Sequence, residues 1–109
     1  NRKPVLLGQI KQTESTIFQN YPNPFNPETW IPYYINCRSN ANITIYRMDG
    51  TMITQIYLGI REPGFHVTPG GAAFWNGRDA NGDLLSSGIY FYRLEVNNRS
   101  QVKQMVLLK

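Results

Sequence analysis

Apolar and polar residues alternate with a period of two, or occur in short runs, along most of this chain. Gly, Asn and Pro separate the runs, and no stretch shows the 3.6-residue period of an amphipathic helix. The pattern therefore predicts β-strands and no helix. The expected strands are 16–19, 29–36, 41–48, 51–58, 73–76, 89–96 and 101–108, with a further short strand near His66 and Val67.

The clearest connection lies between the runs 41–48 and 51–58. Asp49 and Gly50 stand at their junction, and both residue types tolerate positive φ. This pair therefore predicts a β-hairpin with a two-residue loop.

The other connections are a turn at Asn97 and Asn98 and two long loops, 59–71 and 77–88, rich in Gly and other turn-forming residues. About seven short strands joined by such turns indicate an all-β, antiparallel sandwich. A single sheet could not cover both of its apolar faces.

The stretch 20–33 reads NYPNPFNPETWIPY and departs from the strand pattern. Its four prolines exclude a helix and bias the residues before them toward extended backbone. Its aromatic residues supply more apolar area than a disordered linker has. We therefore expect a rigid, extended segment that Tyr21, Phe25 and Trp30 anchor across the sandwich.

The length of 109 residues predicts one domain with a core of its own. We expect residues 1–15 to be a linker or loosely docked arm and residues 16–109 to be the domain. The apolar run 4–7 is too short for a signal-peptide core, so export would require a leader upstream in a longer chain.

Charge and hydropathy argue against two classes of partner. The net charge is +4, but the eleven Lys and Arg residues are scattered, whereas nucleic-acid binders usually gather them on one face. No run of about 18 apolar residues is present, so we expect no membrane insertion.

The residues that usually carry catalysis form no recognisable set. His66 and Cys37 occur once each, on segments without nucleophile–base spacing, and we expect a packing or surface histidine and a small buried cysteine. The seven carboxylates lie mostly in turns or linkers, and nothing marks a pair for acid–base work. We therefore expect neither enzymatic activity nor a cofactor.

One short motif resembles a metal site. Asp79, Asn81 and Asp83 have the spacing of the first ligands of a calcium loop, but Leu84 and Tyr90 replace the glycine and glutamate that such a loop requires. We expect a polar turn whose side chains bond their own backbone, with weak calcium binding as the alternative.

Aromatic residues make up 13% of the chain, enough for a sugar-binding face. Trp75, Tyr90 and Tyr92 fall on predicted core positions. Phe91, Tyr57 and Tyr46 are the better candidates for the exposed side. A row of two or three coplanar exposed rings would favour a carbohydrate-binding module.

Several ordered motifs in residues 16–109 resemble the type IX secretion system C-terminal sorting domain (type A) and the related Ig-like domain of the flagellar hook-capping protein. The proline-rich stretch carries most of the resemblance, followed by FWNGRD and SGIYFYRL. The matching residues are Asn20, Tyr21, Pro22, Asn23, Pro24, Phe25, Asn26, Pro27, Trp75, Gly77, Gly88, Tyr90, Tyr92, Lys103 and Lys109. The chain departs from the family at Arg47, at Asn76 and at Gln104, which follows Lys103 where a lysine pair is common.

The resemblance implies an Ig-like β-sandwich at the C-terminus of a larger secreted bacterial protein. Its partners would be the secretion machinery at the outer membrane and the upstream cargo domain, and its location the periplasm, the outer-membrane surface or the medium. The first hypothesis is thus a non-catalytic sorting and anchoring signal. A structural Ig-like spacer, a carbohydrate-binding module and self-association through an open sheet edge stay open as alternatives.

Overall fold

The computed structural model describes residues 14–109, which form nine strands and no helix. The described residues therefore contain no helix that could cross a membrane. The expected arm, 1–15, lies outside the described residues except for Glu14 and Ser15.

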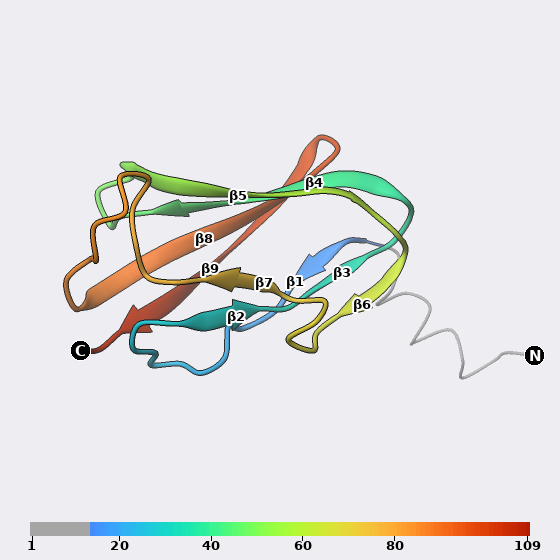
Figure 1. The fold of residues 1–109 in the computed structure, drawn as a ribbon. Helices are drawn as coiled ribbons and strands as arrows, with labels where there is room; N and C mark the ends of the chain where they lie inside the picture. Colours follow the sequence, from blue (N-terminus) through green and yellow to red (C-terminus); the bar gives the residue numbers. More distant parts are fainter. Residues whose placement is uncertain (1–13) are drawn as a thin grey trace, which may run out of the picture.

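One layer is a four-stranded antiparallel sheet in the order β5-β4-β8-β9 (Figure 1). Its strands are β4 (Ser39–Tyr46), β5 (Met52–Arg61), β8 (Gly88–Val96) and β9 (Arg99–Leu107). Strands β5 and β9 are its edges.

Two smaller antiparallel sheets form the facing layer (Figure 1). The order β1-β3-β6 joins β1 (Thr16–Ile17), β3 (Tyr33–Ile35) and β6 (Gly64–His66), and β2 (Thr29–Ile31) pairs with β7 (Ala73–Trp75). The predicted fold class, an all-β antiparallel Ig-like sandwich, is confirmed.

Nine strands are present in residues 14–109 where about seven were predicted, and Pro32 accounts for one of the two extra strands. The run 29–36 was expected to be one strand, but Pro32 divides it into β2 and β3, which pair in different sheets. Proline has no N–H to donate to a ladder, so a strand is readily interrupted there.

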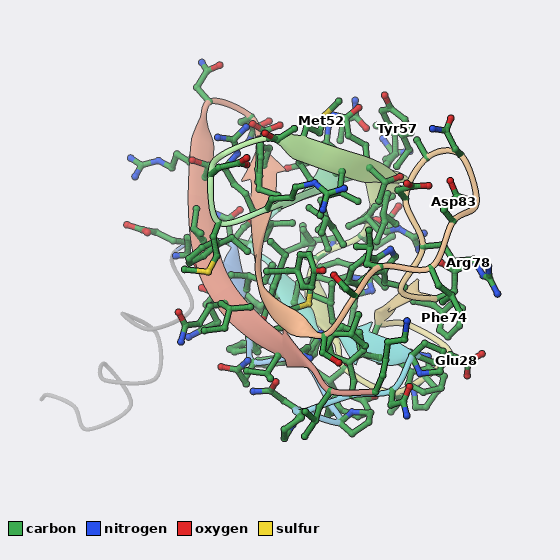
Figure 2. All side chains as sticks on the ribbon, turned by 90° about the vertical axis from the view of Figure 1, so that its left-hand side faces the viewer. Glu28, Met52, Tyr57, Phe74, Arg78 and Asp83 are labelled. Carbon is green, nitrogen blue, oxygen red and sulfur yellow. The ribbon has the colours of Figure 1, made fainter. Side chains whose placement is uncertain are left out.

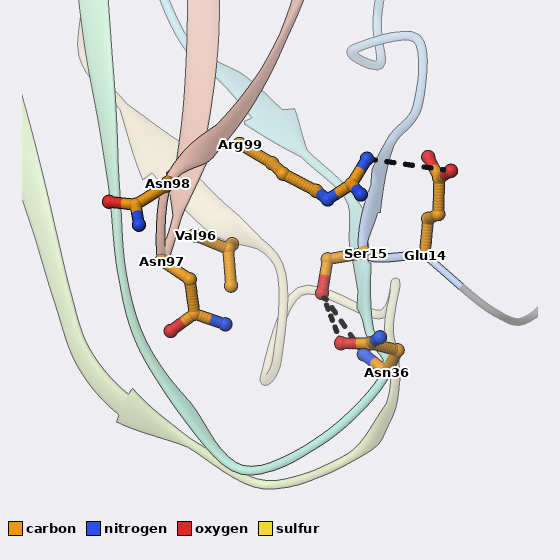
Figure 3. A pocket seen from close by; sticks show the side chains of 7 residues that line it. All are labelled: Glu14, Ser15, Asn36, Val96, Asn97, Asn98 and Arg99. Atoms are coloured by element: carbon orange, nitrogen blue, oxygen red, sulfur yellow. Dashed lines mark hydrogen bonds and ion pairs between the residues drawn. The ribbon is translucent and has the colours of Figure 1, made fainter.

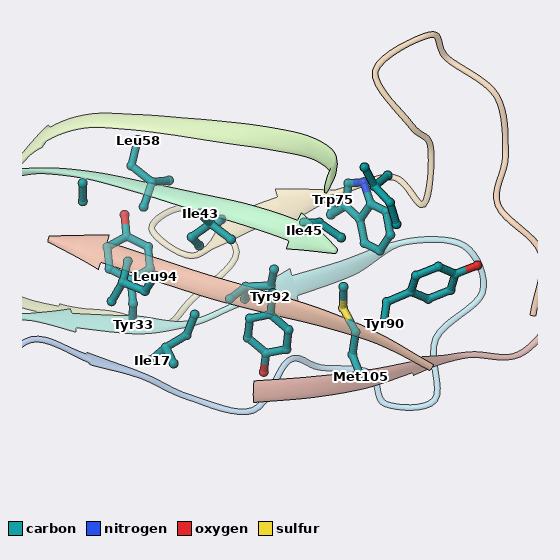
Figure 4. Packing of buried hydrophobic residues seen from close by; sticks show 14 of the residues in the cluster. Ile17, Tyr33, Ile43, Ile45, Leu58, Trp75, Tyr90, Tyr92, Leu94 and Met105 are labelled. Atoms are coloured by element: carbon teal, nitrogen blue, oxygen red, sulfur yellow. The ribbon is translucent and has the colours of Figure 1, made fainter. Parts of the chain in front are cut away.

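The core lies between the layers, where side chains from both point toward one another (Figure 4). On β8 the alternation was predicted correctly: Tyr90, Tyr92, Leu94 and Val96 are all buried. Their ring and aliphatic surfaces leave water together, which is the main favourable term for this fold.

The hairpin between β4 and β5 is confirmed, but its loop was predicted wrongly. Arg47 N–H donates to the Thr51 carbonyl and Gly50 N–H to the Arg47 carbonyl, so three residues form the loop, with Gly50 at φ 89°. A tight turn followed by a left-handed glycine is the usual three-residue solution. The two-residue loop occurs between Val96 and Arg99 instead.

The expected loop 59–71 begins later than predicted, because β5 continues to Arg61. Gly59, at φ 75°, lies at a register shift opposite Ala41 and Asn42. A glycine inside a strand often marks such a β-bulge, which lets pairing continue beyond it.

The proline-rich segment is packed as expected, but it is not extended throughout. Bends occupy residues 22–24 and 26–27, and single bridges form at Tyr21 and Phe25. The bonds Tyr21–Pro22, Asn23–Pro24 and Asn26–Pro27 are cis. Of the three expected anchors only Phe25 is buried, since Tyr21 and Trp30 lie on the outer face.

Candidate functional site

The proline-rich segment lies beside the C-terminal end of β9. Phe25 N–H donates to the Val106 carbonyl at 2.9 Å, and Leu108 N–H donates to the Phe25 carbonyl at 3.0 Å. These bonds form a parallel bridge between Phe25 and Leu107. The segment thus covers the free edge of the last strand at this end.

Two side chains extend the same contact. Asn23 Oδ1 accepts the Val106 N–H at 2.9 Å, and Gln19 Nε2 donates to the Gln104 carbonyl at 2.9 Å. We call this contact the C-terminal seam and define it as Gln19, Asn23 and Phe25 with Gln104, Val106 and Leu108. It joins the beginning and the end of the domain.

Phe25 is the apolar anchor of the seam. Its side chain is 1% exposed, and its ring centroid lies 5.7 Å from that of Trp75. Trp75 in turn meets the Tyr90 ring edge-on at 6.3 Å (Figure 4). Both polar groups of this row are bonded, Trp75 Nε1–H to the Arg78 carbonyl and Tyr90 O–H to the Ser86 carbonyl.

Gly77 allows a close approach of β7 to the proline-rich segment. A Cβ at Gly77 would lie 2.6 Å from the Pro27 carbonyl oxygen, and φ is 77° there. Only glycine satisfies both conditions without strain. At Gly88, by contrast, a Cβ would meet nothing nearer than the Tyr90 ring at 3.9 Å, so the structure shows no steric need for glycine.

A buried polar network fixes the entry into the proline-rich segment. Tyr92 Oη accepts the Asn20 N–H at 2.9 Å and donates to the Phe18 carbonyl at 2.8 Å. Asn20 Nδ2 donates to Thr29 Oγ1 and to the Pro22 carbonyl. Burial raises the pKa of the Tyr92 hydroxyl to about 12, against the smaller opposing effect of the Asn20 N–H.

The two matching lysines lie differently. Lys109 is hydrogen-bonded to the loop before β8: its main-chain N–H donates to Ser87 Oγ at 2.9 Å, and its Nζ donates to the Leu85 carbonyl at 3.2 Å. Lys103 is exposed on β9. The remaining motif positions Pro22, Asn23, Pro24 and Asn26 are exposed, and Pro27 is half-buried.

On the other half of β9 no described strand pairs with the outer edge, although Ile17 N–H donates to Gln101 Oε1 at 2.9 Å and Glu14 lies 3.8 Å from Arg99. The main-chain N–H and carbonyl of Val106 bond the proline-rich segment and therefore point away from β8. The pairing of β8 with β9 has no register shift, so every second residue of β9 has the same orientation. The main-chain groups of Ser100 and Val102 therefore also point away from β8. No other described residue bonds these groups of Val102. The seam therefore covers one half of this edge strand, while the Val102 main-chain groups on the other half have no partner among residues 14–109.

The Asp79 loop is a self-bonded polar turn. One carboxylate oxygen of Asp79 accepts the N–H groups of Asn81 and Asp83, and Arg78 bonds the Gly82 carbonyl. Figure 2 shows Asp83 on the projecting part of this loop. Among residues 14–109, no three His, Cys, Asp or Glu side chains are placed to hold a metal ion.

The structure does not bring the candidate nucleophile and base together. Cys37 is exposed, not buried as expected, because it lies in the bend between β3 and β4. His66 stacks on the buried Tyr33 ring at 4.8 Å, and its Nε2 lies 2.9 Å from the Glu62 carbonyl oxygen. Histidine in this setting is a packing residue.

A polar pocket of about 520 Å³ lies beside the turn between β8 and β9, at the end of β9 that is remote from the seam. Figure 3 shows the side chains that line it. Amide side chains and the Arg99–Glu14 ion pair, 3.8 Å apart, line it. Ser15 bonds Asn36 at its rim. These exposed groups offer hydrogen bonds, but no nucleophile stands beside a base.

Of the three aromatic residues that were predicted to be exposed, only Tyr57 is exposed, and most of the exposed rings lie on the other layer. Tyr57 is 76% exposed as expected, but Phe91 and Tyr46 are half-buried, and the Arg93 guanidinium covers the Tyr46 ring at 4.9 Å. A larger group lies on the outer face of the other layer: Phe18, Tyr21, Trp30, Tyr34, Phe65 and Phe74. We call it the aromatic strip. Figure 2 shows Tyr57 and Phe74 on opposite layers.

No family model and no curated protein matches this chain. Among solved structures, PorU from Porphyromonas gingivalis is similar, with a TM-score of 0.63 and 18% identity over 86% of this chain and 9% of PorU. PorZ, an essential surface component of the type IX secretion system of the same bacterium, has a TM-score of 0.55 and 16% identity over 84% and 11%.

FlgD from P. aeruginosa has a TM-score of 0.49 and 19% identity over 88% of this chain and 63% of FlgD. The chain thus spans about a tenth of PorU and of PorZ. What it shares with them is the fold. At these identities, the likeness shows the fold alone and supports the Ig-like sandwich.

Proposed function

We propose that this domain is a non-catalytic C-terminal module of a larger secreted bacterial protein, serving as its sorting and surface-anchoring signal. The secretion machinery at the outer membrane would read strand β9, and the upstream cargo would reach the cell surface or the medium. The observation that carries the proposal is the C-terminal seam, which fixes the end of β9 while the Val102 main-chain groups on the same edge have no partner among residues 14–109.

The physical argument is strand addition. An open edge offers main-chain donors and acceptors to an incoming strand, and the side chains beside it supply specificity. On β9 the half away from the seam carries the exposed residues Ser100, Val102 and Lys103. The shared fold with part of PorZ, a component of such a system, supports the proposal.

A reporter export assay tests this function. The chain is fused to the C-terminus of a reporter with a signal peptide, in a bacterium with an intact type IX system. The test variant is Val102→Pro, because this residue turns its N–H away from β8 and proline there removes an edge donor only. Val102→Ala is the matched control. Removing residues 101–109 is unsuitable because Met105 and Leu107 are buried.

We expect the wild type and Val102→Ala to deliver the reporter to the surface or medium, and Val102→Pro to leave it in the periplasm. Circular dichroism and melting of the purified variants check that both are folded. Retention of the wild-type fusion would contradict the sorting function and leave a structural spacer. Equal export of a folded Val102→Pro would overturn the role of the edge.

A further inference from the structure

The aromatic strip, defined above, lies on the outward face of the second layer. Trp30, Tyr34 and Phe74 each stand between two buried residues on their strands, so their side chains point away from the core. Phe65 and Phe74 are 57% and 44% exposed. Tyr21 is 37% exposed, and Phe18, Trp30 and Tyr34 are half-buried. Exposed apolar rings that lie side by side in this way are a candidate binding surface.

The rings form two ordered groups. Tyr21, Trp30 and Phe74 follow one another across neighbouring chain segments, with centroid distances of 6.2 and 5.3 Å; the first two rings are nearly parallel, at 18°, and Phe74 is tilted by 56° from Trp30. Phe65 lies between Phe18 and Tyr34, at 6.2 and 4.8 Å.

Backbone pairing holds these rings in place. The main chains of Tyr21 and Trp30 exchange two hydrogen bonds of 2.8 Å, and Tyr21 O–H donates to the Val67 carbonyl at 2.6 Å. This last bond links the two groups of rings. Because these side chains are already ordered, binding of a ligand would cost the protein little side-chain conformational entropy.

We infer that the aromatic strip binds a neutral glycan chain. The faces of aromatic rings are negative, and the C–H groups on a pyranose face carry partial positive charge, so the two are complementary. Around the strip, the residues two positions away along the chain include Thr16, Asn36 and Asn76, whose polar side chains also bond neighbouring residues of the domain, and Glu28 is the charged exception. This setting suits an uncharged ligand.

Retention of the 109-residue chain on cellulose, chitin, xylan and mannan tests the inference, with alginate as the anionic probe. We expect salt-independent retention on a neutral polysaccharide. Trp30→Ala should weaken it about tenfold, as expected for the loss of one stacking ring. Tyr57→Ala, an exposed ring on the other layer, is the matched control and should bind as the wild type does.

Fluorescence gives a second readout, because Trp30 is half-buried on the strip and Trp75 is in the core. A matching oligosaccharide should change the emission of the wild type and leave that of Trp30→Phe unchanged. Phe74→Ser replaces Trp30→Ala if the latter melts early. No retention on any neutral polysaccharide, equal retention by folded strip variants, or salt-sensitive binding to alginate alone would each overturn the inference. None of these results bears on export.

Discussion

At the scale of single residues, Gly77 shows that a contact far away in the chain can add to the need for a glycine. Gly77 and Gly82 both have positive φ, of 77° and 88°. Only Gly77 also faces backbone, since a Cβ there would stand 2.6 Å from the Pro27 oxygen, whereas nothing lies within 4 Å at Gly82. The two positions therefore separate backbone strain from steric overlap.

Gly82→Ala should lower the free energy of unfolding by about 1 kcal/mol, the usual cost of a left-handed residue with a Cβ. Gly77→Ala should cost about 1–3 kcal/mol more, because Pro27 must also move. Urea unfolding of both variants measures the difference. Equal losses would show that the proline-rich segment yields freely at this contact.

At the scale of elements, the C-terminal seam holds the end of β9. Asn23 accepts the Val106 N–H, while Asn26, three residues on, is exposed and has no hydrogen bond to the other described residues. Both asparagines belong to the same segment. The pair therefore offers a matched comparison of a seam residue with a surface residue.

Asn23→Ala should speed hydrogen exchange of the Val106 amide several-fold, because this N–H loses its acceptor. Asn26→Ala should leave the exchange rate unchanged. Native-state hydrogen exchange by NMR measures both. Unchanged exchange in Asn23→Ala would mean that the backbone bonds of Phe25 alone close the seam.

At the scale of the whole molecule, Tyr92 connects the two layers. It belongs to β8, and its hydroxyl bonds Asn20 and Phe18 on the opposite side of the core. Burial raises the pKa of Tyr92 from 10.0 to about 12. The folded protein therefore keeps the hydroxyl protonated at pH values where the unfolded chain releases the proton.

Since the folded pKa is raised, the contribution of Tyr92 is complete below pH 10 and is lost as the pH rises toward 12. Denaturant unfolding between pH 9 and 12 should show falling stability, to which Tyr33, whose pKa is also raised by burial, contributes in the same direction. Tyr92→Phe should be less stable at pH 7 and should show a shallower decline. An unchanged slope would contradict the assignment.

Local pattern was enough to predict the β-class, the runs that became β4, β5, β8 and β9, and the buried face of β8. These features depend on neighbouring residues: a period of two places alternate side chains on one face, whatever the strand pairs with. Of the three expected anchors, Tyr21, Phe25 and Trp30, only Phe25 is buried. The loop at Asp49 and Gly50 was predicted one residue too short, because the bonds that close it join Arg47 to Thr51 and to Gly50.

The sequence by itself determined which residues alternate and where the chain turns. Only the tertiary structure decided which segments meet. The bond from Val106 to Asn23 spans 83 positions, and the aromatic strip gathers rings from five separate segments. The alternation of apolar and polar residues predicts whether a side chain faces the core or the solvent, but it does not predict which strand lies beside it. That choice is made by the packing of both layers around one core.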